Sequence, residues 1–453
     1  MSQQDNNGIN CRPWSWVPSL YFAEGIPYII VMVVSLTMYK RLGLSNTDAA
    51  LYTSWLYLPW IIKPLWSPFV DMFKTKRWWI LLTQMFIGAS IGGVGLSITT
   101  DFFVGISLSL FWIMAFCSAT HDIAADGYYM LALDSHHQSL FVGIRSTFYR
   151  ISMIAGQGVL IFVAGVLEKK LGNIQMAWTL TMYIGAGLMI MLGLYHHMAL
   201  SKPKTDSHRS SYSVQYNKNE GLLLTLLVMF GRTLKKFYQK KDFWVALSFI
   251  LLFRLGEAQL CKISPLFMLD PVEKGGLGLS TEQLGLINGT AGICALTLGG
   301  LLGGWLVSRN GLKHWLWPMV CCMNLPNLVY VYLSITQTQS IAAVAACVCV
   351  EQFGYGFGFT AFMLYLIYHS MGKQKTSDYA ICTGLMAAGM MIPGLWAGWL
   401  QEHIGYVNFF IWVMVCTLPG FLISRRLNIN PDYGIKKEDN VANDEHNSTD
   451  IDK

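Results

Sequence analysis

Charged residues are scarce in this sequence. Only 13% of its residues are Asp, Glu, Lys or Arg, against about 25% in a typical soluble domain, and 53% are hydrophobic. A soluble core cannot absorb that excess of apolar side chains, whereas a lipid bilayer can. The ten cysteines include no C-x-x-C pair, and nine of them lie in or beside apolar stretches. We therefore predict buried cysteines, with no metal site and no cofactor.

Two further signals are missing. The first ten residues, MSQQDNNGIN, lack a basic region followed by a short apolar core, so we expect no signal peptide and a first helix that is retained. The net charge of +6 comes from short basic clusters between apolar stretches. Such clusters report membrane topology, and we predict no nucleic-acid partner.

Long apolar stretches are what the chain does have. A helix of about 20 apolar residues crosses a bilayer, and we place twelve such spans, six in each half of the chain. They lie near 15–37, 49–70, 78–99, 102–130, 139–167 and 176–199, and near 243–269, 283–307, 315–336, 341–371, 378–400 and 406–427. The fold class is therefore an all-α polytopic membrane protein.

Polar segments divide the chain into parts. We predict a polar N-terminal segment over 1–14, one six-helix bundle over 15–200, a linker over 201–242, a second bundle over 243–427 and a disordered polar tail over 428–453. The linker ends in a stretch that turns from apolar to basic at Lys235, Lys236, Lys240 and Lys241. This stretch reads as an amphipathic helix on an anionic membrane surface, or as a short extra span.

Basic residues set the orientation of the spans. If the N-terminus is cytoplasmic, the short inner segments carry Arg12, Lys74, Lys76, Arg77, Arg309, Lys313, Lys373, Lys375, Arg425 and Arg426, and the outer ones carry only Lys40, Arg41, Lys169, Lys170 and Lys274. Because inner loops are enriched in Lys and Arg, both termini are predicted to be cytoplasmic.

The two halves are weakly similar to each other. Residues 20–27 (LYFAEGIP) open the first half much as residues 251–259 (LLFRLGEAQ) open the second. Two related six-helix halves joined by a polar linker form the major facilitator fold, in which the substrate binds between the halves. Such a fold works as a secondary transporter.

A loop motif supports this fold. Residues 304–311 (GWLVSRNG) match the facilitator pattern G-x-L-x-D-R-x-G at all but one position, with Ser308 in place of Asp. The corresponding loop of the first half holds Asp71 and Arg77. Asp71, Arg77 and Arg309 are candidates for gating the inner face by pairing in one conformation. The alternative is that the basic members are ordinary positive-inside anchors.

The fourth span carries the strongest chemical signal. Asp122 and Asp126 are four residues apart and share a helix face, where two carboxylates cannot both ionise cheaply without a cation. Either the pair holds a proton, or it pairs with Arg145 or Arg150 from the next span. A structural ion cluster remains the alternative.

Further charges occur in the first span of each half. Glu24 lies in the first half, and Arg254 and Glu257 lie at the matching place in the second, with Lys262 beyond them. Since charges at membrane depth rarely face lipid, we predict that they line one central cavity. Arg254 and Glu257 are three residues apart, so they could instead neutralise each other.

The remaining candidates come from single polar or aromatic residues. Lys63 could contact substrate or extend to the lipid headgroups, and the glycines after Glu351 are read as helix-packing residues, not as a nucleotide loop. The full set of substrate-binding candidates is Glu24, Tyr28, Lys63, His121, Arg254, Glu257, Lys262, Glu351 and Tyr355.

Residues 118–128 read SATHDIAADGY and resemble the SATQDIAxDAY signature of the AmpG-like muropeptide permeases, a branch of the major facilitator superfamily related to acetyl-coenzyme A transporters. Similar stretches are LYFAEGIPY at 20–28, LPWIIKPLWSPFVD at 58–71, FRLGE at 253–257, EQLGLIN at 282–288 and AGWLQEHIGY at 397–406. The resemblance covers nearly all of residues 15–427 and departs from the signature at His121.

The resemblance implies proton-coupled import of anhydromuropeptides across a bacterial inner membrane, with the family's acids on Asp122 and Asp126 and its arginine on Arg150. Our prediction is a monomeric proton symporter for a muropeptide or another amino-sugar solute, with another sugar or an acylated cofactor such as acetyl-coenzyme A as the alternative substrate. A membrane enzyme would need a nucleophile and base beyond His121 and Asp122. A sensor would need a folded output domain, and the tail after residue 427 is too short and polar for one.

Overall fold

Helices make up most of the described chain, and turns and short irregular segments connect them. The computed structural model describes residues 13–133, 135–201, 242–371 and 375–431, together with 231, 235, 237–240, 433 and 434, and these residues contain no strand. The all-α prediction is confirmed. Most of the predicted linker helix and nearly all of the tail lie outside the described residues.

The N-terminal half is built from residues 13–201. Its helices are α1 (Val17–Ile29), α2 (Ser35–Arg41), α3 (Asn46–Trp55), α4 (Leu58–Ile62), α5 (Ser67–Met72), α6 (Lys76–Ser97), α7 (Phe103–Ala132), α8 (Ser135–Met153), α9 (Ile161–Leu171) and α10 (Ile174–Ala199). Wider π-helical turns at Ile30–Val34 and Ile154–Leu160 join α1 to α2 and α8 to α9.

The C-terminal half is built from residues 242–434. Its helices are α12 (Phe243–Leu252), α13 (Leu255–Leu269), α14 (Thr281–Leu284), α15 (Ile293–Asn310), α16 (Leu312–Asn324), α17 (Leu328–Thr336), α18 (Ile341–His369) and α19 (Lys375–Ser424). A π-helical segment at Gly285–Gly292 joins α14 to α15. The continuous stretch α19 reverses direction at Gly405, whose φ of 74° is costly for residues other than glycine.

The count of spans agrees with the prediction only in part. Ten helical stretches of the described chain are long and apolar enough to cross a membrane. One of them, Asp378–Ser424, holds the two helices on either side of Gly405. The predicted span 49–70 is instead divided into the short helices α3, α4 and α5. Prolines at positions 59, 64 and 68 remove backbone donors there, which accounts for the breaks.

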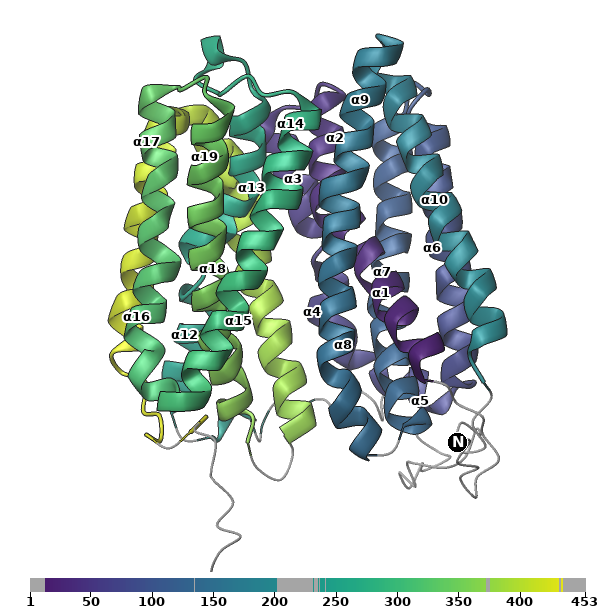
Figure 1. Ribbon diagram of the computed structural model, residues 1–453, viewed down its shortest axis with the longest axis vertical. Helices are drawn as coiled ribbons and strands as arrows, with labels where there is room; N and C mark the ends of the chain where they lie inside the picture. Colours follow the sequence, from purple (N-terminus) through teal and green to yellow (C-terminus); the bar gives the residue numbers. More distant parts are fainter. Residues whose placement is uncertain are drawn as a thin grey trace, which may run out of the picture.

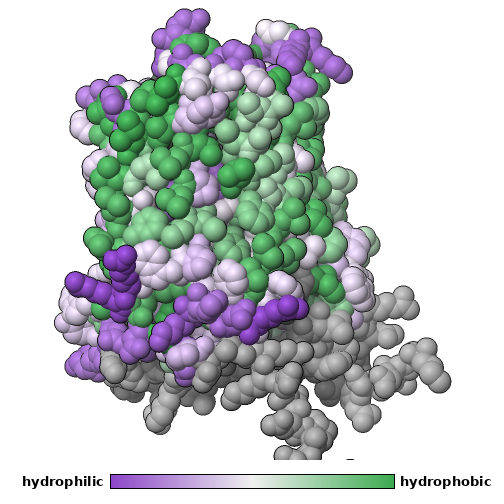
Figure 2. Space-filling model, turned by 60° about the vertical axis from the view of Figure 1, so that its left-hand side comes forward, coloured by the Kyte–Doolittle hydropathy of each residue, from purple (hydrophilic) through white to green (hydrophobic). Residues whose placement is uncertain are grey.

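An apolar belt surrounds the molecule. Large hydrophobic side chains point outward along the helices, as at Leu96, Met198, Leu301 and Leu422, which are 58% or more exposed. Figure 2 shows this green zone between polar, purple ends. A soluble monomer rarely exposes so wide an apolar surface, so the belt is the surface that meets lipid.

The two halves stand side by side with their helices roughly parallel (Figure 1). The described chain begins and ends at the same end of the bundle, which we call the terminus face; we call the opposite end the distal face. Two contact zones join the halves. In one, α3 and α4 pack on α19, and in the other, α9 and the π-helical segment 154–160 pack on α14 and 285–292.

Glycines allow close packing inside the C-terminal half. A Cβ at Gly356 would lie 2.0 Å from the carbonyl oxygen of Leu296, and one at Gly354 would lie 2.1 Å from that of Cys322. Either contact would push α18 away from α15 or α16. The helix-packing interpretation of these glycines is confirmed.

Candidate functional site: a charged cavity between the halves

A cavity of about 150 Å³ lies between the two halves. It is lined by polar and aromatic side chains from both. The N-terminal half contributes Tyr28, Tyr57 and Gln157, among others, and the C-terminal half contributes Arg254, Glu257, Cys261, Lys262, Asn288, Glu351, Gln352 and Tyr355. Five of the predicted substrate contacts in the C-terminal half are thus brought together, along with Tyr28.

Arg254 enters the cavity at the break between α12 and α13. It precedes the first turn of α13, and its guanidinium donates from Nη2 to the hydroxyl of Tyr355 at 2.5 Å. The same group lies 5.5 Å from the ring centroid of Tyr355 and 5.0 Å from that of Phe359. Its Nε is buried and has no hydrogen-bond partner among the described residues. Two aromatic rings therefore hold the cation in place, and its Nε donor remains unused.

Two carboxylates lie beyond Arg254. Glu257 is one turn further along α13, is 2% exposed, and accepts a hydrogen bond at Oε1 from the thiol of Cys261 at 2.9 Å. Glu351 on α18 is 1% exposed and accepts at Oε2 from Gln352 at 2.9 Å. In the described chain, Oε2 of Glu257 and Oε1 of Glu351 have no partner. Glu257 forms no ion pair with Arg254, so the two do not neutralise each other directly.

Lys262 spans the distal side of the cavity. Its ammonium donates to Oγ1 of Thr53 on α3 at 2.9 Å and lies 5.3 Å from the ring centroid of Tyr57. Both partners belong to the N-terminal half. Lys262 therefore ties the two halves together through its ammonium.

The acids of α7 form a second cluster, inside the N-terminal half. Asp122 accepts from Nε1 of Trp60 at 3.1 Å and lies 3.7 Å from Nζ of Lys63. Asp126 pairs with Arg145 at 2.9 Å and accepts from the hydroxyl of Tyr21 at 3.2 Å. Each acid thus has a cation of its own.

Glu24 belongs with this second cluster. Its side chain is buried, within electrostatic reach of Asp126 and Asp122, and its Oε2 has no partner in the described chain. It does not line the central cavity that Arg254 and Glu257 share. The three predicted residues all avoid lipid, but the structure divides them between two places, because Glu24 turns toward α7.

Two other predicted residues lie elsewhere. Arg150 lies next to Gly300 of α15, across the gap between the halves, and makes no ion pair with any described residue. His121 is fully buried, and its Nε2 lies 2.9 Å from Nε2 of Gln84. Gln84 in turn contacts His196, which contacts Ser19. His121 therefore belongs to a buried polar chain between helices of the N-terminal half.

Two of the three gating candidates, Arg77 and Arg309, have described side chains, and the contacts shown for each lie within its own half. Arg77 donates to the carbonyl oxygens of Leu200 at 2.9 Å and His197 at 2.6 Å, both at the end of α10. Arg309 lies 4.0 Å from the ring centroid of Trp305 on its own helix. The side chain of Asp71 is outside the described residues. Their gating role remains a prediction.

A polar lock on the distal face was missed by the sequence analysis. Lys40 pairs with Asp270 at 2.6 Å, and Asn46 donates to Asp270 at 3.1 Å and to Gln401 at 2.7 Å. The hydroxyl of Tyr406 also donates to Asp270. Burial favours the neutral acid, but the hydrogen bonds from Lys40 and Tyr406 outweigh it and hold the pKa of Asp270 below its usual value.

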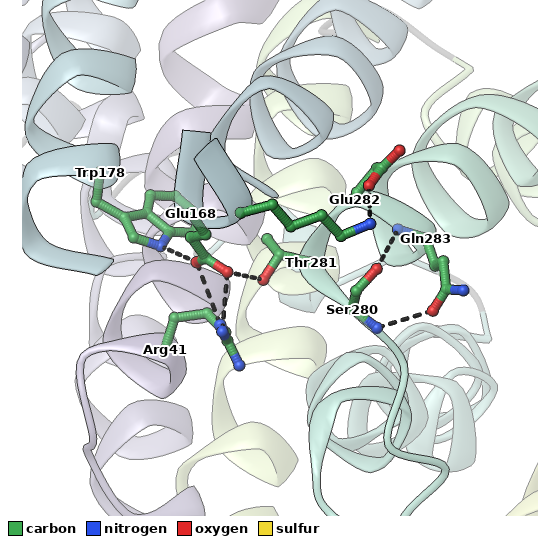
Figure 3. A network of polar contacts seen from close by, with 8 residues as sticks. Arg41, Glu168, Trp178, Ser280, Thr281, Glu282 and Gln283 are labelled. Carbon is green, nitrogen blue, oxygen red and sulfur yellow. Dashed lines mark hydrogen bonds and ion pairs between the residues drawn. The ribbon is translucent and has the colours of Figure 1, made fainter. Parts of the chain in front are cut away.

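Glu168 is the centre of a second part of the lock (Figure 3). It accepts from Arg41 at 2.8 Å, from Nε1 of Trp178 at 2.8 Å and, across the halves, from Thr281 at 2.9 Å. Lys169 beside it pairs with Glu282 of the C-terminal half. The sequence analysis used Lys40, Arg41 and Lys169 only to predict the orientation of the spans. Sequence alone does not show which acidic residue each of them contacts.

The comparisons with known proteins agree with this architecture. The chain is 25% identical to the anhydromuropeptide permease of Escherichia coli (strain K12) over 89% of its length and 77% of that protein. It is 24% identical to the putative transporter AmpG 4 of Rickettsia conorii, covering 90% of the chain and 95% of that protein. A solved POT family transporter is 13% identical with a TM-score of 0.70, covering 93% and 97% of the two chains, which supports the fold alone.

These relatives are transporters, and the prediction of a transporter rather than an enzyme is confirmed. The resemblance to AmpG-like permeases is likewise confirmed by the curated relatives. The profile of the Major Facilitator Superfamily matches residues 19–392, most of the chain. This protein is therefore a multi-pass membrane transporter that belongs to the Major Facilitator Superfamily.

Proposed function

We propose that the protein is a proton symporter that imports a muropeptide or a related amino-sugar solute across a bacterial inner membrane, as a monomer with its terminus face in the cytoplasm. The observation that carries this proposal is the cavity between the halves, which contains buried charged groups with unused hydrogen-bonding atoms. A site of this kind requires a polar solute. The curated permease relative is named for anhydromuropeptides, which supplies the solute class.

Proton coupling is assigned to the acids of α7. Asp126 is 44% exposed in its side chain and is held by Arg145, whereas Asp122 is 16% exposed and is near Lys63. Movement of either cation away from its acid would favour protonation of that acid, and its return would expel the proton. Arg145 takes the role of partner because it contacts Asp126, whereas Arg150 lies near the C-terminal half.

Uptake by reconstituted protein tests both parts of the proposal. Proteoliposomes would be given labelled anhydromuropeptide, its peptide-free disaccharide or acetyl-coenzyme A, with and without an inward proton gradient. We expect accumulation of the muropeptide or the disaccharide only with the gradient. Accumulation of acetyl-coenzyme A alone would support the alternative substrate, and gradient-independent uptake would reject symport.

The coupling residues are tested in the same vesicles. Asp126→Asn or Asp122→Asn should lose gradient-driven accumulation while keeping exchange of labelled for unlabelled solute. Asp101→Asn, at an exposed position on the distal face, is the matched control. If both Asn variants accumulate solute as the original protein does, the acids of α7 are structural.

A further inference from the structure

The charges of the cavity are arranged unlike most of the other buried charges. Elsewhere the fold pairs three buried acids with cations, Asp270 with Lys40, Glu168 with Arg41 and Asp378 with Lys240, each at 2.8 Å or less, and leaves Glu24 without an ion-pair partner among the described residues. In the cavity, Arg254, Glu257 and Glu351 are each at least 94% buried, and none has an ion-pair partner among the described residues. A buried charge without a partner is costly, so these groups are kept for something that enters the cavity.

The positions of Arg254, Glu257 and Glu351 between the terminus face and the distal face follow from the directions of the two helices that carry them. α13 runs from the terminus side toward the distal face, and α18 runs the opposite way. Arg254 touches Tyr355, which fixes one level. Glu257 is three residues beyond Arg254, and Glu351 is four residues before Tyr355, so both carboxylates lie about one turn, roughly 5 Å, further toward the distal face. The guanidinium of Arg254 therefore lies about one helical turn closer to the terminus face than the carboxylates of Glu257 and Glu351.

The unused atoms lie on the same groups. They are Nε of Arg254, Oε2 of Glu257 and Oε1 of Glu351. Lys262 does not satisfy the carboxylates, because its ammonium is bound to Thr53 across the cavity. A ligand that offered only a carboxylate would leave both acids unpaired, and one that offered only an amine would leave the guanidinium unpaired.

We propose that the cavity recognises an α-amino-acid-like zwitterion on its solute, with Arg254 binding the carboxylate and Glu257 and Glu351 together binding the ammonium. An α-amino acid carries both groups on one carbon, which suits charges one helical turn apart. The inference rests on the proposed function, and it narrows the solute to one with a free amino-acid end. A sugar whose attached peptide contains a diamino dicarboxylic acid has such an end, whereas the last residue of an ordinary peptide has its nitrogen in an amide bond.

Binding to the purified protein tests the inference separately from transport. Four ligands are compared by calorimetry: the anhydrodisaccharide alone, the disaccharide with a peptide whose diamino dicarboxylic acid leaves one α-amino-acid end free, the same compound with that amine acetylated, and the same compound with that carboxylate amidated. We expect the free amino-acid end to bind at least about tenfold more tightly than each of the other three, as removal of a buried charge-assisted hydrogen bond implies.

Variants of the cavity residues test which side chain binds the carboxylate of the ligand and which binds its ammonium. Arg254→Gln should remove the preference for the free carboxylate over the amide, and Glu257→Gln or Glu351→Gln should remove the preference for the free amine over the acetylated one. Glu273→Gln and Arg426→Gln, both at exposed positions outside the cavity, are the charge-matched controls. Because the ligand series on the unmodified protein is informative by itself, a variant that fails to fold does not decide the outcome.

The possible failures are distinguishable. If the disaccharide binds and the four ligands differ by less than about twofold, the zwitterion site is rejected while the proposed function stands. If the acetylated compound binds most tightly, Glu257 and Glu351 act as neutral carboxylic acids that donate hydrogen bonds to the solute, and the inference is likewise rejected. If none of the four binds, both the inference and the muropeptide solute are rejected.

Discussion

At the scale of single residues, Asp270 is a buried acid whose carboxylate accepts hydrogen bonds from several donors. Its carboxylate accepts from Lys40, Asn46 and Tyr406, all of which lie outside its own helix. Lys40 and Asn46 come from the N-terminal half, so the acid joins the halves as well as filling its own hydrogen-bonding capacity. Because the hydrogen bonds from Lys40 and Tyr406 hold the pKa of Asp270 below its usual value, these contacts favour the ionised acid.

Asp270→Asn should therefore destabilise the protein in a pH-dependent way. Because the pKa of Asp270 in the folded protein is below the ordinary value of about 3.9, its contribution is fully present above that pH and is lost as pH falls through the folded-state pKa. We expect a loss of about 1–3 kcal/mol at pH 7, since Lys40 loses its charged partner. The difference from the unmodified protein should narrow below about pH 4.

Thermal unfolding in detergent between pH 8 and pH 3.5 measures this effect. Glu273→Gln, which changes an exposed acid of the same loop region, is the control and should leave the midpoint nearly unchanged at every pH. An equal loss for Asp270→Asn at pH 7 and pH 3.5 would mean that packing, not charge, explains the effect.

At the scale of elements, the sequence predicts helices better than it predicts their faces and breaks. Apolar length identified most spans, because a lipid-facing helix needs a long apolar run whatever its partners are. The same rule missed the breaks in 46–72, where proline overrides apolar length. It also gave no way to tell that Glu24 would turn toward α7 whereas Arg254 would turn toward the cavity.

The sequence indicates contacts between residues that are close together on one helix. It does not indicate contacts between residues that are far apart in the chain. Glu257 follows Arg254 by three residues, so the spacing alone suggested that the two share a helix face. Asp270 meets Lys40 from 230 positions away in the sequence, and Glu168 meets Thr281 from 113 positions away. Such contacts depend on how the two halves dock, which local pattern does not encode.

The distal contact between α3 and α19 should be a moving joint. Oγ1 of Thr47 lies 2.5 Å from Oε2 of Glu402, and a Cβ at Gly398 would lie 2.2 Å from the carbonyl oxygen of Asn46, so the two helices touch. We expect that Thr47→Cys with Glu402→Cys, joined by a short bifunctional thiol reagent, will lose at least about 90% of uptake, because the halves cannot separate at this face.

Cleavage of the cross-link should restore uptake, and each single variant treated in the same way should remain active. A matched pair within one half, Val272→Cys with Gln337→Cys, lies on the same face, where the amide of Gln337 contacts the carbonyl of Val272 at 3.4 Å. That pair should be harmless when joined. Full uptake by the cross-linked Thr47 and Glu402 pair would show that transport does not require this face to open.

At the scale of the whole molecule, the halves are joined unevenly. The hydrogen bonds and ion pairs that connect them within the described residues lie on the distal face or at the level of the cavity, from Lys40 and Asp270 down to Lys262 and Thr53. Toward the terminus face the described residues show no such bond between the halves. The contacts of the lock hold the two halves together on the distal face, and we expect a cycle of alternating access to require that these contacts break.

Weakening the lock should therefore expose the cavity from the distal side. Cys261 lines the cavity and serves as a native reporter. In sealed vesicles whose distal face is outward, an impermeant thiol reagent added outside should label Cys261 slowly in the unmodified protein. It should label Cys261 at least about fivefold faster in Asp270→Asn, because losing a charged contact worth about 1 kcal/mol or more shifts the equilibrium between closed and open forms by that factor.

Two controls accompany this measurement. The labelling of Cys261→Ser gives the background from the other cysteines, which is subtracted, and Glu273→Gln should be labelled at the same rate as the unmodified protein. Equal labelling rates in Asp270→Asn and the unmodified protein would show that the pair of Lys40 and Asp270 stabilises the distal loops without controlling access to the cavity.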